Sequence, residues 1–271
     1  MAKLDTNAAW KEASAIVSAN REVLFALAGV FFMLPSLALA VIAGEPEIAP
    51  GMNGEQMMAA MEEFYAGAWW LILISAVLQI VGLMAILTLM RDRSRPTVGQ
   101  AISAGLASTP SYLAAQVIIV IALSLIGGLL IGVAAAVSPA LAVVVVMLVM
   151  GAVVFAVFRL LLVAPVVAVE GMRNPLAAMA RSWRLTQGNF WRLFGFLLLI
   201  LILFVVIVAI VMMIIGLILA LATSGEVQRI IAAVFSSALG AVAVVYFAGV
   251  IAAIHRQLGG PAAADLSATF E

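Results

Sequence analysis

The sequence predicts an all-α membrane protein with six transmembrane helices, on the strength of its composition, the length of its apolar segments and the separation of its charges. Hydrophobic residues make up 66% of the 271-residue chain and charged residues 10%. A water-soluble domain is about 45–50% apolar and about 25% charged. With a mean hydropathy of +1.28, the chain has too little polar surface for a water-soluble globule, so its apolar runs are predicted to be transmembrane helices.

Six apolar segments reach the length of about 20 residues that a bilayer requires. The fourth and fifth are about 30 residues long, so each must tilt, kink or extend beyond the hydrocarbon. Pro35 and Pro165 lack a backbone donor and give the first and fourth segments a place to kink. The first segment is interpreted as a retained span because its apolar run exceeds the roughly 7–15 residues of a signal-peptide core. The predicted spans are residues 22–43, 66–90, 112–134, 140–169, 191–222 and 228–254.

The charges separate across these spans. With six spans, all 13 basic residues except Arg159 and Arg229 fall on one side of the membrane. The loop at 44–65, on the opposite side, contains no Lys or Arg but has glutamates at positions 45, 47, 55, 62 and 63. The positive-inside rule then places both termini in the cytoplasm. An odd number of spans would scramble this separation, so the charges support the span count independently.

A short amphipathic helix, called an elbow below, is predicted at 175–187. Asn174 suits the N-cap, Pro175 the first helical position and Gly188 the stop. Its apolar face consists of Leu176, Met179, Ala180 and Trp183, which predicts a helix lying in the headgroup region. Similar elbows are predicted at 5–19 and 97–108. An elbow followed by two spans would then occur three times, although a polar lead-in before each span pair explains the pattern equally well.

Arg159 is the sharpest candidate for a functional residue. If the fourth span were one continuous helix, Arg159 would lie about 16 Å from Glu170 along the axis. A charge at that depth costs at least about 2.5 kcal/mol. Arg159 therefore either contacts a lipid phosphate or an anionic solute, or bonds to carbonyls of a helix broken near Pro165 or to another span. A polar cavity lined by Gln79, Gln116 and Arg159 is one form that a ligand site would take.

A second group of candidates surrounds the third elbow. Glu170, Arg181 and Arg184 have two interpretations. They form an ion pair that fixes the elbow to the end of the fourth span, or they are part of a headgroup site. The second interpretation follows because basic residues next to the membrane attract anionic lipids. Headgroup or elbow contacts are also predicted for Trp183, Asn189 and Trp191, the two tryptophans because aromatic rings favour the interface. The arginines at 91, 93 and 95 invite the same interpretation, or are simply part of the positive-inside cluster.

The most specific part of the sequence runs from Arg159 to Leu193. It has an arginine, Pro165, the pair Glu170-Gly171 and then Arg181-Ser-Trp-Arg-Leu185, closed by Gly188-Asn-Phe-Trp191. This pattern resembles the membrane-domain family of glycerophosphoryl diester phosphodiesterase, and the whole plan resembles small bacterial inner-membrane proteins. The resemblance implies a multi-pass protein of the bacterial inner membrane. Some members of the family carry a soluble phosphodiesterase barrel with histidine and paired acidic residues at a metal site, and this chain has no room for one.

Several kinds of chemistry are excluded by the residues themselves. The chain has no cysteine and one histidine, His255, which leaves no thiolate site and no histidine-based metal cluster. No Walker loop and no G-x-S-x-G elbow occurs. We therefore predict no catalytic residues, no cofactor and no metal. His255 is interpreted as a headgroup contact, and the balanced charge gives no reason to expect a nucleic-acid partner.

The leading functional hypothesis is a non-catalytic membrane protein that binds or organises phospholipids. The alternative is a transporter or channel component for a small anionic solute or lipid, and a membrane-embedded enzyme of lipid metabolism is the weakest of the three. Membrane phospholipids are the expected partners. Small-residue pairs such as Gly128 and Gly132 leave open a membrane-protein partner or a homo-oligomer.

Overall fold

The computed structural model describes residues 3–44, 46–90 and 97–259, and these residues form helices joined by short connections, without a strand. Six stretches are helical, long and apolar enough to cross a membrane, which confirms the predicted all-α fold with six spans. The predicted arginines at 91, 93 and 95 lie outside the described residues. The elements are α1 (Thr6–Ala19), α2 (Arg21–Ala28), the π-helical turn η1 (Gly29–Met33), α3 (Leu34–Ala38), η2 (Leu39–Ala43), α4 (Gly54–Leu89), α5 (Val98–Val137), α6 (Pro139–Arg159), α7 (Val163–Ala168), α8 (Pro175–Leu185), α9 (Phe190–Ala222) and α10 (Gly225–Gly259).

The first span passes Pro35 without a sharp kink. Pro35 is at the second position of α3, and the π-helical turns η1 and η2 flank that helix. A wider turn absorbs the missing backbone hydrogen bond without ending the helix. The span packs closely on α4, because a Cβ added to Gly82 would lie only 2.4 Å from Cβ of Phe31.

The second span begins earlier than predicted, at Gly54 instead of residue 66. The Asn53 side chain accepts a hydrogen bond from the Gln56 N–H, and the Gln56 side chain accepts one from the Asn53 N–H. This capping box starts a helix in a segment whose glutamates hide it from a search for apolar runs. The first turns of α4 therefore form a polar extension of the second span.

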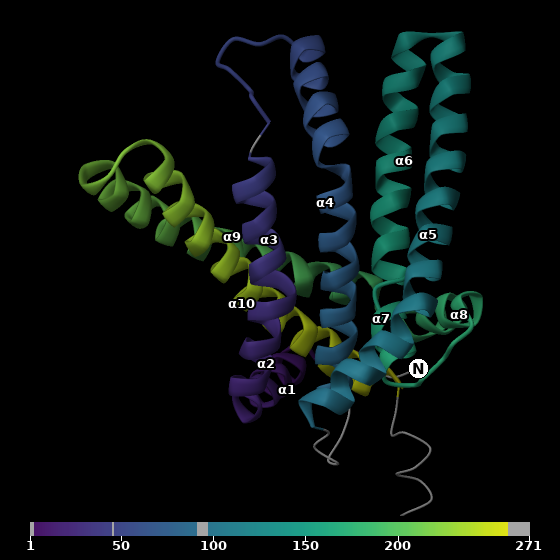
Figure 1. The fold of residues 1–271 in the computed structure, drawn as a ribbon. Coiled ribbons are helices and arrows are strands. Elements are labelled where there is room, and N and C mark those ends of the chain that lie inside the picture. The colour runs from purple at the N-terminus through teal and green to yellow at the C-terminus, as the bar shows by residue number, and fades with distance from the viewer. Residues whose placement is uncertain (1–2, 45, 91–96, 260–271) are drawn as a thin grey trace, which may run out of the picture.

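The second elbow is not a separate helix, which corrects the prediction of an elbow at 97–108. It forms the first turns of α5, which continues through Pro110 into the third span. Pro110 has no N–H to donate to the carbonyl of Leu106, four residues earlier. Figure 1 shows these first turns slanting across the molecule before α5 becomes upright, so the proline bends the helix without ending it.

Each predicted elbow packs on a membrane-spanning helix. The first turns of α5 meet α4, where a Cβ added to Gly105 would lie 2.8 Å from the backbone nitrogen of Ala85. The elbow α8 packs on the junction of α6 and α7. The elbow α1 packs on α10, where the Cβ position of Gly249 is 3.0 Å from Val17. All three elbows lie at one end of the molecule, called the elbow end below (Figure 1).

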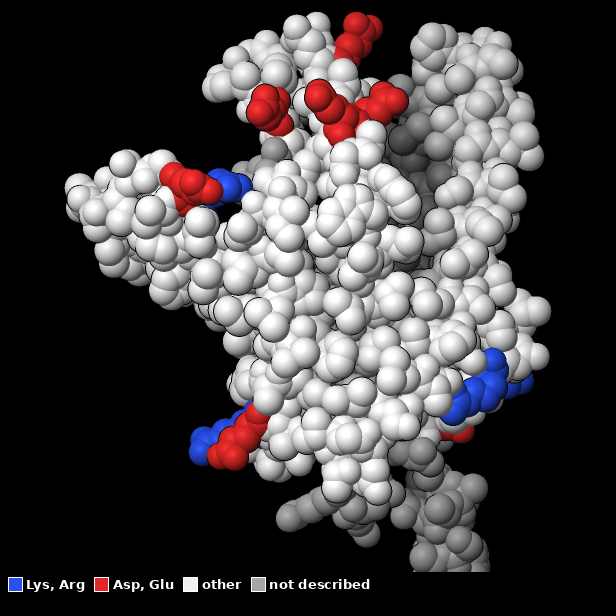
Figure 2. Space-filling model, viewed as in Figure 1, with Lys and Arg blue, Asp and Glu red and all other residues white. Residues whose placement is uncertain are grey.

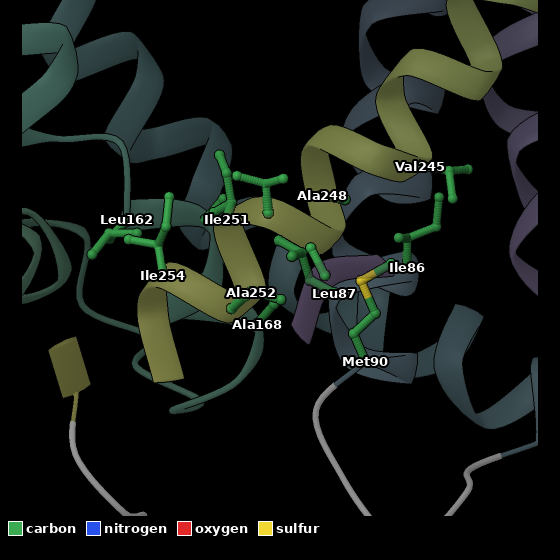
Figure 3. Close-up of a cluster of buried hydrophobic side chains, with 14 of the residues drawn as sticks. Ile86, Leu87, Met90, Leu162, Ala168, Val245, Ala248, Ile251, Ala252 and Ile254 are labelled. Atoms are coloured by element: carbon green, nitrogen blue, oxygen red, sulfur yellow. The ribbon is translucent and has the colours of Figure 1, made fainter. Parts of the chain in front are cut away.

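The hydrophobic core lies at the elbow end of the molecule. Side chains from α4, α7 and α10 point toward one another there (Figure 3), and many of them, such as Leu87, Leu162 and Ile254, have no contact with solvent. Close-packed side chains leave few voids as large as a water molecule. The elbow end is therefore plugged by apolar side chains.

Charge divides the two ends of the molecule as the sequence predicts. Figure 2 shows the glutamates of the segment before α4 and of its first turns gathered at the end opposite the elbows. Basic residues lie at the elbow end, on α1, α8 and the starts and ends of neighbouring helices. Between the ends the visible surface is almost uncharged, which is the pattern of a bilayer-spanning protein.

The hairpin of α9 and α10 leans away from the upright helices α4, α5 and α6 (Figure 1). The most apolar part of α9 has no buried residues. Lipid tails are as apolar as these side chains, so a helix that is apolar on all sides is stable in a bilayer. The rest of this helix, near Phe190, belongs to the junction described next.

Candidate functional site

The candidate site lies where the fourth span breaks. The helix α6 ends at Arg159, residues 160–162 are not helical, and α7 begins at Val163. Pro165 causes the break, because its ring disfavours a helical residue four positions earlier and it has no N–H for the Leu161 carbonyl. The sequence predicted a kink at Pro165, and the structure places the break one turn before it.

The elbow α8 supplies hydrogen bonds to the backbone groups that this break exposes. The Ser182 hydroxyl donates to the carbonyl oxygen of Arg159 at 2.9 Å and accepts from the N–H of Leu162 at 3.1 Å. The Thr186 hydroxyl donates to the same carbonyl at 3.1 Å. A broken helix within a membrane protein needs such partners, because unsatisfied backbone groups are costly there.

The helix α8 forms where the sequence predicts it. The Asn174 side chain accepts hydrogen bonds from Leu176 N–H and Ala177 N–H, and Gly188 takes a positive φ of 77° after the helix. Its buried face, however, consists of Ala178, Ser182 and Leu185. The apolar face predicted from the sequence points outward, with Leu176 and Trp183 exposed. That outward face is what a helix in the headgroup region presents to lipid.

Arg159 is buried at this junction, with 6% of its surface exposed. Its guanidinium carbon lies 4.6 Å from the centre of the Trp183 ring and 5.7 Å from that of Phe155. Its Nε is buried without a hydrogen-bond partner, and among the described residues its side chain forms no ion pair. Cation–π contacts stabilise the charge in part, but the structure offers it no anion.

The continuous helix assumed between Arg159 and Glu170 does not form, so the distance of about 16 Å along one helix axis does not apply. Instead, α6 ends at Arg159 and the following residues turn into α7. Arg159 lies beside Trp183 of the elbow, not far below it.

Phe155 and Trp183, the two rings that contact Arg159, belong to a cluster of six aromatic rings from α6, α8 and α9. Phe155 joins Trp183, at 5.8 Å between ring centres, to Phe190, at 4.9 Å. The other contacts, at 5.1–6.1 Å, are Phe158 with Phe190 and Phe194, Phe190 with Trp191 and Phe194, and Trp191 with Phe194. Trp191 is 78% exposed, so one edge of the cluster meets the surroundings as an interfacial tryptophan does.

Glu170 holds the loop between α7 and α8. Its carboxylate lies 3.1 Å from Nε of Arg181 and 2.9 Å from Nε2 of His255, at the end of α10. Burial by itself raises the pKa of Glu170, but hydrogen bonds from His255 and Arg181 and the charge of Arg181 lower the pKa below that of an ordinary glutamate. The predicted ion pair thus forms with Arg181, while Arg184 is exposed and is not part of it. His255, predicted to contact headgroups, is buried instead.

These features lie in one segment of the chain that the comparisons with known proteins identify. Residues 134–258 match the family described as the membrane domain of glycerophosphoryl diester phosphodiesterase. This confirms the resemblance predicted from the sequence. The matched segment runs from the end of α5 to the end of α10 and contains Arg159, α8 and the Glu170 cluster. No curated protein and no solved structure matches the chain.

Within the matched membrane domain, Asn189 is buried, so its side chain is out of reach of a headgroup. Its Oδ1 accepts a hydrogen bond from Leu4 N–H at 3.0 Å, and Arg192 donates to the Leu4 carbonyl oxygen at 3.4 Å. Nearby, Gln257 accepts from Asp5 N–H at 3.2 Å. These residues tie the segment before α1 to the starts and ends of the membrane-domain helices.

The predicted cavity of Gln79, Gln116 and Arg159 does not form. Gln116 lines a cavity between α4, α5, α6, α7 and α10, but neither Gln79 nor Arg159 does. The sequence analysis missed Tyr112, which lines the same cavity. Tyr112 and Gln116 are four apart on one helix, and that spacing could have revealed the pair. Among the described residues, no cluster of acidic or histidine side chains could hold a metal ion.

Proposed function

We propose that this chain is a non-catalytic protein of the bacterial inner membrane that binds phospholipids, with Arg159 contacting the lipid phosphate. The carrying observation is a buried arginine that has no anion and no hydrogen-bond partner among the described residues, but stacks on Trp183. A buried charge is costly unless it is paired. A phosphate oxygen at the guanidinium edge supplies that pairing, and charge-assisted hydrogen bonds to phosphate are strong.

The surroundings of Arg159 favour a lipid over a soluble anion. The outward face of α8 and the exposed Trp191 suit the headgroup layer. A lipid lying there brings its phosphate to the level of Arg159 while its chains extend along the exposed apolar surface of α6 and α9. The matched family describes a membrane domain, which supports a role without catalysis for this segment.

Native mass spectrometry of the protein in a gentle detergent tests this proposal. We expect the wild type to retain an anionic phospholipid and Arg159→Gln to retain it at least about ten-fold less, because a charge-assisted hydrogen bond is lost. Lys11→Gln is the matched control, since it also removes one positive charge but Lys11 is exposed on α1, outside the Arg159 junction. Competition with inorganic phosphate distinguishes a lipid from a free anion. Equal, non-selective lipid retention by both folded variants would overturn the proposal.

A transporter or channel component for a small anionic solute is the second candidate. The broken fourth span favours it, because discontinuous helices often form the binding sites of transporters. The buried apolar side chains that close the elbow end give the transporter hypothesis less support. The variant Ala164→Cys, in a chain without native cysteines, tests for a water-filled path. Rapid labelling by a small charged thiol reagent would favour transport, and protection would favour lipid binding.

A further inference from the structure

A second site lies inside the membrane-spanning part of the molecule, separate from Arg159. A cavity of about 200 Å³ is enclosed by α4, α5, α10 and the junction of α6 and α7. Its walls are aliphatic or aromatic except for Tyr112 and Gln116, and no charged residue lines it. The lining includes Leu161, in the non-helical segment after α6. The break in the fourth span thus contributes to a cavity as well as to the Arg159 site.

The cavity opens toward lipid and is closed toward the elbow end. Val157 and Phe247 line it and are 49% and 43% exposed on membrane-spanning helices. On the elbow side, Leu87 and Ile251 belong both to its wall and to the buried core (Figure 3). A molecule that enters must therefore come from the bilayer.

The polar groups of the cavity can both donate to and accept from a ligand. Tyr112 and Gln116 both line the cavity, and a phenol and an amide together offer several hydrogen-bond donors and acceptors. A hydroxyl group, which donates one hydrogen bond and accepts others, complements this set.

We propose that the cavity binds the hydroxyl end of a neutral lipid alcohol, whose hydrocarbon chain leaves between Val157 and Phe247 into the bilayer. The absence of a charged lining residue disfavours an ionised headgroup, because an unpaired charge is costly in an apolar site. An apolar cavity of about 150 Å³ holds a benzene molecule, so about 200 Å³ has room for a hydroxyl group and several carbons. This site does not depend on a phosphate at Arg159.

Photo-crosslinking tests the proposal with the full chain in lipid nanodiscs. The probe is a sixteen-carbon primary alcohol with a diazirine near its hydroxyl, and the matched probe is its methyl ether, which cannot donate a hydrogen bond. We expect the alcohol to label residues of α5 and α10 around the cavity, and unlabelled alcohol but not the corresponding alkane to compete. The variants Gln116→Met and Tyr112→Phe should each reduce labelling about five-fold, as expected for one lost hydrogen bond.

Gln79→Met is the control, because Gln79 also lies in a span but does not line the cavity. Both cavity variants keep the side-chain size nearly constant, and an unchanged thermal midpoint shows that they fold. The proposal is overturned if the ether labels as strongly as the alcohol, if the cavity variants label like the control, or if the label spreads over the exposed surface of α9.

Discussion

Ser182 on α8 donates a hydrogen bond of 2.9 Å to the carbonyl oxygen of Arg159, the last residue of α6, and accepts one of 3.1 Å from Leu162 N–H. One side chain from the elbow thereby bridges both ends of the break in the fourth span. The two partners are 20 and 23 positions away along the chain. The two hydrogen bonds of Ser182 hold the elbow α8 against the fourth span.

We expect Ser182→Ala to destabilise the protein by about 1–3 kcal/mol, because it leaves the buried N–H of Leu162 without its partner. Thr186 still donates to the Arg159 carbonyl, so the loss should stay within that range. Denaturant unfolding in a fixed detergent measures it. Ser18→Ala is the control, since Ser18 is exposed and bonds only to a carbonyl in its own helix. Equal effects of the two substitutions would show that the bridge contributes nothing.

The Glu170 cluster predicts a loss of stability in acid. Because the folded-state pKa of Glu170 is lowered from about 4.5, its ionised form contributes stability that is fully present above that value. The contribution decreases as the pH falls below about 4.5 and is lost once the pH has passed through the folded-state pKa. Thermal midpoints measured from neutral pH into acid should fall less steeply in this window for Glu170→Gln. Glu55→Gln, at the opposite end of the molecule, should keep the wild-type slope.

The contact between Gly105 and Ala85 predicts strong sensitivity to a single methyl group. A Cβ at position 105 would lie 2.8 Å from a backbone nitrogen, so Gly105→Ala must move the second elbow and should cost about 1–3 kcal/mol. Gly128→Ala, in the same helix with no atom within 4 Å of the new Cβ, should be neutral or stabilising by up to about 1 kcal/mol. Thermal unfolding of both variants checks this, and a Gly105→Ala variant as stable as the wild type would contradict the packing.

The charge separation predicts the orientation of the chain. Because the protein has no cysteine, single substitutions report one position each. In spheroplasts a membrane-impermeant maleimide should label Glu55→Cys directly, and should label Arg184→Cys only after permeabilisation. The reverse pattern would place the elbow end outside the cell.

Much of the fold could be predicted from the sequence, because hydrophobic length and charge act locally. The six spans follow from apolar runs, and α8 follows from Asn174 and Pro175 at its start and Gly188 after its end. The early start of α4 was missed because its capping box lies among glutamates. The continuity of α5 was missed because Pro110 is also the residue at which a helix commonly ends.

The candidate site was harder to predict, because its geometry depends on contacts between distant segments. Arg159, Trp183 and Glu170 were identified from their residue types and positions. The position of Arg159 depends on the break after α6. Neither Pro165 nor the hydrophobic periodicity predicts the residue at which the helix breaks. The contact of Glu170 with His255 joins positions 85 residues apart, and no local pattern reports such a pair.

The packing of α1 on α10 sets the order in which the fold can be completed during synthesis. The first elbow emerges from the ribosome first, but the surface that covers Ala9, Ala13 and Val17 belongs to the last span. Domains generally begin to fold from the N-terminus as they are made. The first elbow can therefore reach its packed position only after α10 has been made. The last step of folding is therefore the docking of α1, which is made first, onto α10, which is made last.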